Sequence, residues 1–295
     1  METPAMELAV RTLAQKNLAS VGELYQTCQI MQRAMPVAAS IDNYIEAQQG
    51  TPHVEALGKL AIALRILQAE RSTKLFFDGR QGERPPLTEL SRHWHASLCR
   101  YLFENVHWDG VGDVFDNVAF IVFNYDRCLE MFLFCALKDY YNLSDAQAGE
   151  VMTAVTIIHP YGSVGPLAWN RPHDSYGFGA QLHASELLTV SGKIVTFSES
   201  LECSRANDIL GVVSEARTAV FLGFSYLQQN MNLLENVAAI ERVYATAWKM
   251  SVSDVGRAKD RISDTFRMPP DAPIEVSNSL DAKALMAEYS LSITQ

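Results

Sequence analysis

Three short apolar runs of this chain each end in polar residues whose types could carry out chemistry. Each run is rich in Val, Ile and Phe and is bounded by turn residues, which is typical of a buried strand in a parallel sheet. Ligands of open α/β sheets bind outside the carboxyl ends of the strands, so the residues behind the runs are candidate site residues. The runs and the residues behind them are Val118–Phe123 with Asn124, Tyr125 and Asp126, Ala154–Ile158 with His159 and Gly162, and Ala219–Leu222 with Gly223 and Ser225.

His159 is the strongest candidate for acid–base chemistry. Its side chain is the one best suited to proton transfer near neutral pH. It lies in a turn with Gly162 and Gly165, and glycines allow the backbone to approach a ligand closely. The alternative is a buried histidine that is hydrogen-bonded to the backbone.

Asn124 and Ser225 each have a structural alternative. Asn and Asp are preferred N-cap residues, so Asn124 or Asp126 could serve only to satisfy free N–H groups of the following helix. Gly223-Phe224-Ser225 invites comparison with the nucleophile elbow of α/β-hydrolases, but Leu227 stands where that motif needs a glycine. The last histidine of the chain is His183, so none follows Ser225 as the hydrolase order requires. Ser225 is therefore expected to line a pocket or to cap the next helix.

The elements that must position these residues are parallel strands that alternate with helices. The helical pattern of residues 1–108 and the alternation of strands and helices over residues 109–270 predict an α/β protein with a Rossmann-like parallel sheet and a helical N-terminal region. Residues 53–77 of the helical region have one apolar stripe, made of Leu57, Leu60, Ala61, Leu64 and Leu67. Ser40 is expected to cap a helix that begins at Ile41, and Ser144 to begin a short helix that ends at Met152. Residues 271–295 are expected to form a C-terminal tail. No Gly-rich dinucleotide fingerprint or phosphate-binding P-loop is present, and Gly177-Phe178-Gly179 has two glycines but follows no predicted strand.

The composition narrows the possible partners. Asp and Glu outnumber Lys and Arg by 34 to 24, which argues against a nucleic-acid partner held by phosphate contacts. No apolar run reaches the length of about 20 residues that a membrane helix needs, and the first residues do not resemble a secretory signal. The five cysteines are scattered, which predicts reduced thiols, a cytoplasmic protein and no structural metal site. They are Cys28, Cys99, Cys128, Cys135 and Cys203.

Taken in order, the strings FIVFNYDRCLEMFLFCAL, IIHPYGSVGPL and VFLGFSYLQQNMNLL resemble the sirtuin-like family. The similarity is greatest to bacterial members that lack the deacetylase zinc module and occur in anti-phage defence systems. Upstream, SIDNYIEAQQ and GKLAIALRILQAER look like the helical insert of those proteins. The resemblance therefore covers the chain from Ser40 to about Leu234 and implies a Rossmann-like sheet that binds NAD.

The resemblance also implies catalytic roles. The asparagine of the family's N-Y-D stretch is matched by Asn124, and it would orient the nicotinamide ribose and a water molecule. The catalytic histidine of the family's H-x-x-G turn is matched by His159, which would act on a ribose hydroxyl while the nicotinamide bond breaks. The implied activity is NAD hydrolysis.

Further residues are implied as contacts of the cofactor. Tyr125 and Asp126 complete the N-Y-D stretch, and Gly162 completes the H-x-x-G turn. The family's glycine-serine turn near the adenosine ribose is matched by Gly223 and Ser225.

The sequence departs from the family at its start. The family begins with a strand and a G-A-G-A-S-like loop that holds the NAD diphosphate, whereas the pattern before Ser40 is helical. Without the backbone donors of that loop, the chain as given is expected to bind NAD weakly and to turn it over poorly or not at all. Restoring a strand and a Gly-rich loop is expected to recover binding.

Two other functions stay open. The first is a non-catalytic nucleotide-binding or scaffold module that keeps the fold but not the turnover. The second is protein deacetylation, which is disfavoured because the clustered cysteines of a zinc module are absent. For both the NAD hydrolase and the non-catalytic module, the expected partner is a small nucleotide. The sequence leaves the oligomeric state open, a homo-oligomer included.

Overall fold

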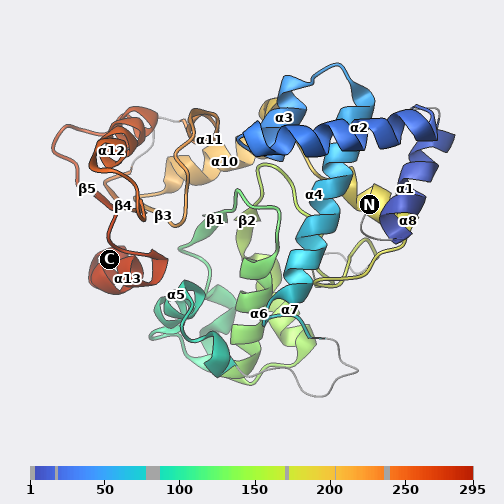
Figure 1. Ribbon diagram of the computed structural model, residues 1–295. Coiled ribbons are helices and arrows are strands. Elements are labelled where there is room, and N and C mark those ends of the chain that lie inside the picture. The colour runs from blue at the N-terminus through green and yellow to red at the C-terminus, as the bar shows by residue number, and fades with distance from the viewer. Residues whose placement is uncertain are drawn as a thin grey trace. The chain divides into compact units, whose positions relative to one another are not determined.

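The protein is a mixed α/β molecule whose strands form small parallel sheets (Figure 1). The computed structural model describes residues 4–16, 19–77, 87–169, 173–202, 204–235 and 240–294, and Cys203 lies outside them. Its internal contacts divide the chain into two compact units, each assembled from three stretches of sequence. Unit 1 comprises Met1–Glu83, Val122–Met131 and Tyr161–Glu202, and unit 2 comprises Arg84–Ile121, Phe132–Pro160 and Cys203–Gln295.

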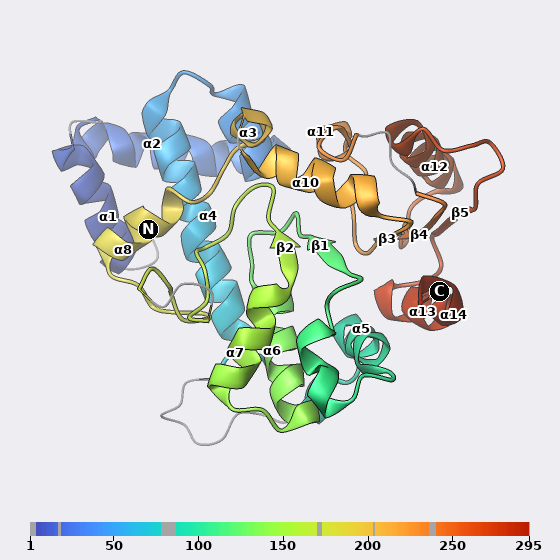
Figure 2. The ribbon, with the colours of Figure 1, turned by 180° about the vertical axis from the view of Figure 1, so that it is seen from behind.

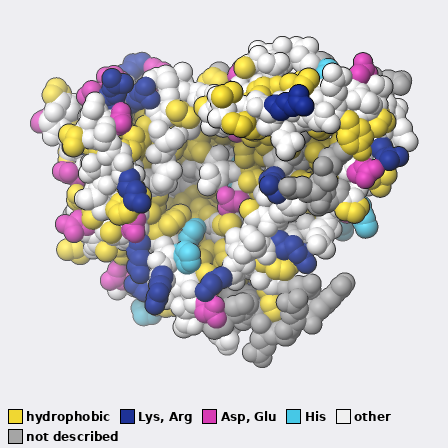
Figure 3. All heavy atoms as spheres, in the orientation of Figure 1, with side chains coloured by type: hydrophobic (Ala, Val, Ile, Leu, Met, Phe, Trp, Pro, Cys, Tyr) yellow, Lys and Arg dark blue, Asp and Glu magenta, His cyan; other side chains and the backbone are white. Residues whose placement is uncertain are grey.

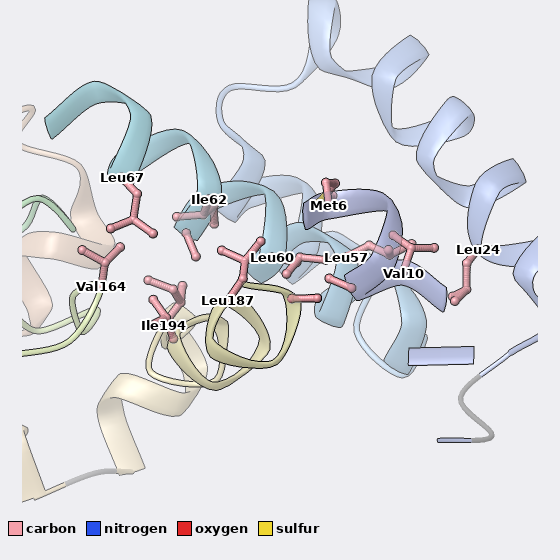
Figure 4. Packing of buried hydrophobic residues seen from close by; sticks show 14 of the residues in the cluster. Met6, Val10, Leu24, Leu57, Leu60, Ile62, Leu67, Val164, Leu187 and Ile194 are labelled. Atoms are coloured by element: carbon pink, nitrogen blue, oxygen red, sulfur yellow. The ribbon is translucent and has the colours of Figure 1, made fainter. Parts of the chain in front are cut away.

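Unit 1 is a group of helices around the long helix α4. Leucines at three- and four-residue spacing give α4 an apolar stripe, and Leu57, Leu60 and Leu67 are almost completely buried. Figure 4 shows Leu60 beside Leu187 of α8, Leu57 towards Val10 of α1, and Leu67 towards Val164. The stripe predicted from the sequence is therefore the centre of this core. The helices of unit 1 are α1 (Pro4–Gln15), α2 (Val21–Ala34), η1 (Met35–Val37), α3 (Ile41–Ala47), α4 (Pro52–Ser72), α8 (Ala184–Ser191) and α9 (Phe197–Glu202).

Serine side chains begin several helices at the positions that the sequence predicts. Ser40 Oγ accepts a hydrogen bond from the Asn43 backbone N–H at 3.1 Å and so caps α3. Ser144 caps α7 (Asp145–Ala154) in the same way, with a reciprocal bond from its own N–H to Gln147. These local bonds fix where the helices start.

Unit 2 contains the strands, which pair in parallel. β1 (Ala119–Ile121) pairs with β2 (Thr156–Ile158), with Ile121 opposite Ile158, and Figure 2 shows the two side by side. A second sheet has the order β3 (Thr218–Phe221), β4 (Arg242–Thr246) and β5 (Ile274–Ser277). The remaining helices are η2 (Leu87–Leu90), α5 (Trp94–Phe103), η3 (Trp108–Asp113), α6 (Cys128–Tyr141), α7, α10 (Ser204–Glu215), α11 (Gln228–Asn232), α12 (Val252–Phe266), α13 (Ala282–Glu288) and α14 (Ser290–Ile293).

The α/β class and the parallel pairing are confirmed, but three details differ from the prediction. The ladders of the described residues form two sheets, of two and three strands, where one sheet is expected. β1 and β2 are only partly buried, since each has a single partner strand in its sheet. Residues 271–295 contain β5, α13 and α14 where the sequence predicts a tail, because β5 pairs with β4 and α13 packs against α5 and β4.

Candidate functional site

The segment that follows β1 in the sequence carries Asn124 on the surface of unit 1. Asn124 is exposed, whereas Tyr125 and Asp126 are partly buried. Asp126 Oδ1 accepts a hydrogen bond from the backbone N–H of Cys128, the first residue of α6, at 3.1 Å. Asp126 therefore has the capping role that was the structural alternative for Asn124 and Asp126, since it satisfies one of the free N–H donors at the start of a helix.

Tyr125 is held by a carboxylate of α3. Its hydroxyl donates a short hydrogen bond to Asp42 Oδ1, and its ring centroid lies 6.4 Å from that of Tyr161. Burial raises the pKa of the Tyr125 phenol far above its ordinary value, and the negative charge of Asp42 raises it further. Both effects favour the protonated phenol, which is the form that donates to Asp42.

The raised pKa of Tyr125 predicts a loss of stability in alkali. Below its ordinary pKa of 10.0 the phenol is protonated in both the folded and the unfolded chain, so its contribution is fully present. Above that value the unfolded phenol ionises first, and stability falls by about 1.4 kcal/mol per pH unit for this group. Urea unfolding between about pH 9 and pH 11 should show a shallower fall for Tyr125→Phe than for the wild type. Equal slopes would show that Tyr125 ionises normally in the folded protein.

Arg127, which directly follows Asp126, forms a completely buried ion pair with Glu70 of α4. The side chains of Arg127 and Glu70 are 1% and 0% exposed. Arg127 Nη2 lies 2.6 Å from Glu70 Oε2, and both Nε and the backbone N–H of Arg127 donate to Glu70 Oε1 at 3.0 and 2.9 Å. Glu70 occupies a polar position of a helical pattern, and such a pattern does not show which of its polar side chains is buried. The sequence alone therefore did not indicate this pair.

The same guanidinium group binds the backbone of the segment that follows β2. Arg127 Nη1 donates to the carbonyl oxygens of Gly165 and Tyr176 at 3.2 and 2.7 Å, and Nη2 donates to that of Gly177 at 3.1 Å. The backbone N–H of Gly179 donates to Glu70 Oε2 at 2.9 Å. The two glycines of Gly177-Phe178-Gly179 therefore serve the buried ion pair, and the N–H of Gly179 already has a carboxylate acceptor.

Gly179 and Gly177 offer a matched pair of substitutions. Gly179 has a φ of +60°, and a Cβ placed there would lie 2.7 Å from the backbone of Arg71. The left-handed conformation alone costs an alanine about 1–2 kcal/mol, and the contact with the backbone adds to this. Gly179→Ala should therefore lower the free energy of unfolding by more than this amount in urea titrations. Gly177→Ala should leave it almost unchanged, because the nearest atom would be 3.9 Å away. Equal effects of the two substitutions would contradict this conformation of the segment.

The turn that follows β2 in the sequence contains His159 and Gly162. His159 is partly buried, and the carbonyl of the next residue, Pro160, accepts a bond of 3.4 Å from Arg205 of α10. Gly162 is buried and has a φ of +75°, a conformation that favours glycine. The backbone at this position therefore requires the residue type that the sequence analysis singled out.

In the turn that follows β3 in the sequence, both candidate residues, Gly223 and Ser225, are exposed. Gly223 has a φ of +64°, and its N–H donates to Thr246 Oγ1 of β4 at 2.8 Å. Ser225 is exposed, and Asn230 Nδ2 donates to its hydroxyl at 3.4 Å. The N-cap of α11 is Leu227, so the expectation that Ser225 caps this helix is wrong.

The candidate residues fall into two groups. Unit 1 contains Asn124, Tyr125, Asp126 and Gly162, and unit 2 contains His159, Gly223 and Ser225. The strands that lead into Asn124 and His159 are paired in parallel, so their carboxyl ends lie at the same edge of one sheet. Gly223 and Ser225 follow a strand of the other sheet.

Other features bear on the class of protein. Among the described residues, no three His, Cys, Asp or Glu side chains are grouped so that they could hold a metal ion. Cys28, Cys99, Cys128 and Cys135 are free thiols, and burial raises the pKa of Cys99 to about 12. None of the helices in the described part of the chain is both long and apolar enough to cross a bilayer. Figure 3 shows basic and acidic side chains interspersed on the face that it draws.

The comparisons with known proteins gave no match. No protein-family model, no curated protein and no solved structure is similar to this chain.

Proposed function

We propose that this chain is a sirtuin-like protein that binds NAD at a Rossmann-like sheet and hydrolyses the bond between nicotinamide and ribose. The observation that supports this best is the parallel pairing of β1 and β2, because Asn124 and His159 follow these two strands. The carboxyl edge of such a pair is where ligands of α/β proteins bind. The proposed setting is anti-phage defence in the bacterial cytoplasm, and self-association is compatible with it.

The proposed reaction consumes NAD and water and yields nicotinamide, ADP-ribose and a proton. The bond from the ribose C1′ to the nicotinamide nitrogen breaks, its electron pair leaves with nicotinamide, and the water oxygen bonds to C1′. The attacking water gives up the released proton as its oxygen bonds to C1′. His159 accepts a proton from a ribose hydroxyl while the nicotinamide bond breaks and returns it to the same oxygen when the product forms, and the exposed amide of Asn124 orients the ribose and the water. Gly162, with its left-handed backbone, and the exposed Gly223 and Ser225 contact the rest of the cofactor.

A non-catalytic nucleotide-binding or scaffold module is the second candidate. It is favoured by the structural use of the residues next to Asn124, since Tyr125 binds Asp42 and Asp126 caps α6. A protein that has kept the fold but lost turnover would retain these contacts as well. The N-Y-D stretch alone therefore does not separate the two functions.

Chromatographic measurement of nicotinamide and ADP-ribose after incubation with NAD separates the two candidates. The proposal expects both products in equal amounts when a strand and a Gly-rich loop precede the chain, and little or no product without them. In the version that carries the loop, His159→Ala is expected to lower their formation by at least ~100-fold. Binding of NAD without either product would favour the non-catalytic module. Neither binding nor products, in a chain that also carries a Gly-rich diphosphate loop, would refute both.

A further inference from the structure

The buried ion pair joins two segments that contain candidate site residues. Arg127 lies in the stretch Val122–Met131, three residues after Asn124, and Gly162 lies in the stretch that begins at Tyr161. Both stretches belong to unit 1, and Glu70 of α4 provides the common anchor. The pair is therefore placed to control the conformation of both stretches at once.

The hydrogen bonds around the pair fix its geometry more strictly than an ion pair with a single contact would. Both oxygens of Glu70 accept two N–H donors each, three from Arg127 and one from Gly179. Arg127 adds bonds to three carbonyl oxygens of residues 165–177. Only a planar guanidinium with its five donors can satisfy so many acceptors in fixed directions.

The described residues between Gly165 and Gly179 belong to no helix or strand, so contacts of side chains and turns hold their shape. Lys193 pairs with Asp174 at 2.9 Å, Arg71 Nη1 donates to the Gly179 carbonyl at 3.3 Å, and Tyr176 N–H donates to the Pro166 carbonyl. The Arg127–Glu70 pair adds the bonds that connect this stretch to the Asn124 segment. Tyr176 packs across Gly165, where a Cβ would lie 2.9 Å from the ring. Removing the guanidinium would leave three carbonyl groups without these donors, and that of Gly165 lies in the buried interior of unit 1, where an unsatisfied acceptor costs most.

We propose that Arg127 and Glu70 are positioning residues that hold the Asn124 segment and the described residues of the Gly162–Gly179 segment, 162–169 and 173–179, in one fixed arrangement, which is called the lock below. The consequence for catalysis, which rests on the proposed function, is that Asn124 meets the nicotinamide ribose in a fixed orientation. A misplacement of about 1 Å at a reacting group can cost a factor of about 100 in rate. The pair touches no reacting atom and acts through the two segments.

Amide hydrogen exchange of the wild-type chain tests the lock directly. The N–H groups of Arg127 and Gly179 both donate to the buried carboxylate of Glu70, so they should exchange slowly, and each should be slowed by the same factor relative to its own rate in the unfolded chain. Rates at different positions are compared after this normalisation. Fast exchange at Gly179, or clearly different rates at the two positions, would overturn the proposal. This measurement needs no variant and no ligand.

The variant Arg127→Lys tests the lock by keeping the charge and removing the fork of donors. A lysine cannot reach Glu70 and three carbonyl groups together, so exchange should accelerate by about 10-fold or more in both segments. The matched control is Arg11→Lys, which changes an exposed Arg–Glu pair of α1 and should leave both segments unchanged. Acceleration in only one segment, or in neither, would overturn the lock.

Kinetics of the same variant separate positioning from stability. Where NAD hydrolysis is measured, Arg127→Lys should lower kcat by about 100-fold with little change in KM, while Arg11→Lys should change neither. An unchanged kcat despite faster exchange would refute the positioning role. If neither the wild type nor a version with a strand and a Gly-rich loop in front of it hydrolyses NAD, the proposed function fails, and the exchange rates alone decide whether the pair holds the two segments together.

Discussion

Replacement of His159 by alanine should lower the rate of NAD hydrolysis by at least ~100-fold, and replacement of Asn124 should do the same. This factor is the low end for the loss of a positioned acid–base group. Both residues follow the ends of strands, and neither belongs to the buried cores, so the midpoint of urea unfolding should hardly change. Nicotinamide release under saturating NAD measures the effect.

The controls for these two variants lie in the same protein. His107→Ala and Asn117→Ala remove the same side chains from exposed positions elsewhere in unit 2, and turnover should stay at the wild-type level. Unchanged turnover in both His159→Ala and Asn124→Ala would remove the proposed mechanism. A loss in only one of them would leave that residue as the sole catalytic group.

The second large effect is expected from breaking the buried ion pair on one side. Glu70→Ala leaves the Arg127 guanidinium buried without its counter-ion, which should cost about 3–5 kcal/mol of the free energy of unfolding. Glu7→Ala removes a carboxylate from the exposed pair with Arg11 and should have a far smaller effect, because that pair lies in water. Urea unfolding curves of both variants measure the difference.

The contrast between the two glutamates makes this prediction specific. If Glu70→Ala were as stable as Glu7→Ala, Glu70 and Arg127 could not be buried together as the structure has them. A large loss in both would indicate that stability follows any change of charge in unit 1 and not the buried pair.

The sequence predicted the elements whose signals are local. The stripe of Leu57, Leu60 and Leu67 and the serine cap of α3 are decided by neighbouring residues, and both are confirmed. β4 and β5 were missed because charged residues, Arg242 at the start of β4 and Glu275 within β5, shorten their apolar runs, so neither strand forms a continuous apolar run like those of β1, β2 and β3. Their pairing depends on residues far away in the chain.

The candidate site shows the same division between local and distant information. The sequence indicated Gly162 and Gly223 as special backbone positions, and both have the left-handed conformation. It could not indicate the Arg127–Glu70 pair, whose partners are 57 positions apart. Burial of a charge depends on three-dimensional packing, and a charged residue in a helical pattern is usually solvated.

Calorimetric titration with NAD tests the central claim most directly. It compares the 295-residue chain with a version in which a strand and a Gly-rich loop precede it. The account predicts weak or undetectable binding by the first and clearly tighter binding by the second, since backbone donors for the diphosphate are then supplied. Absence of NAD binding by both forms, or equal affinity of the two, would contradict a sirtuin-like NAD site in this protein.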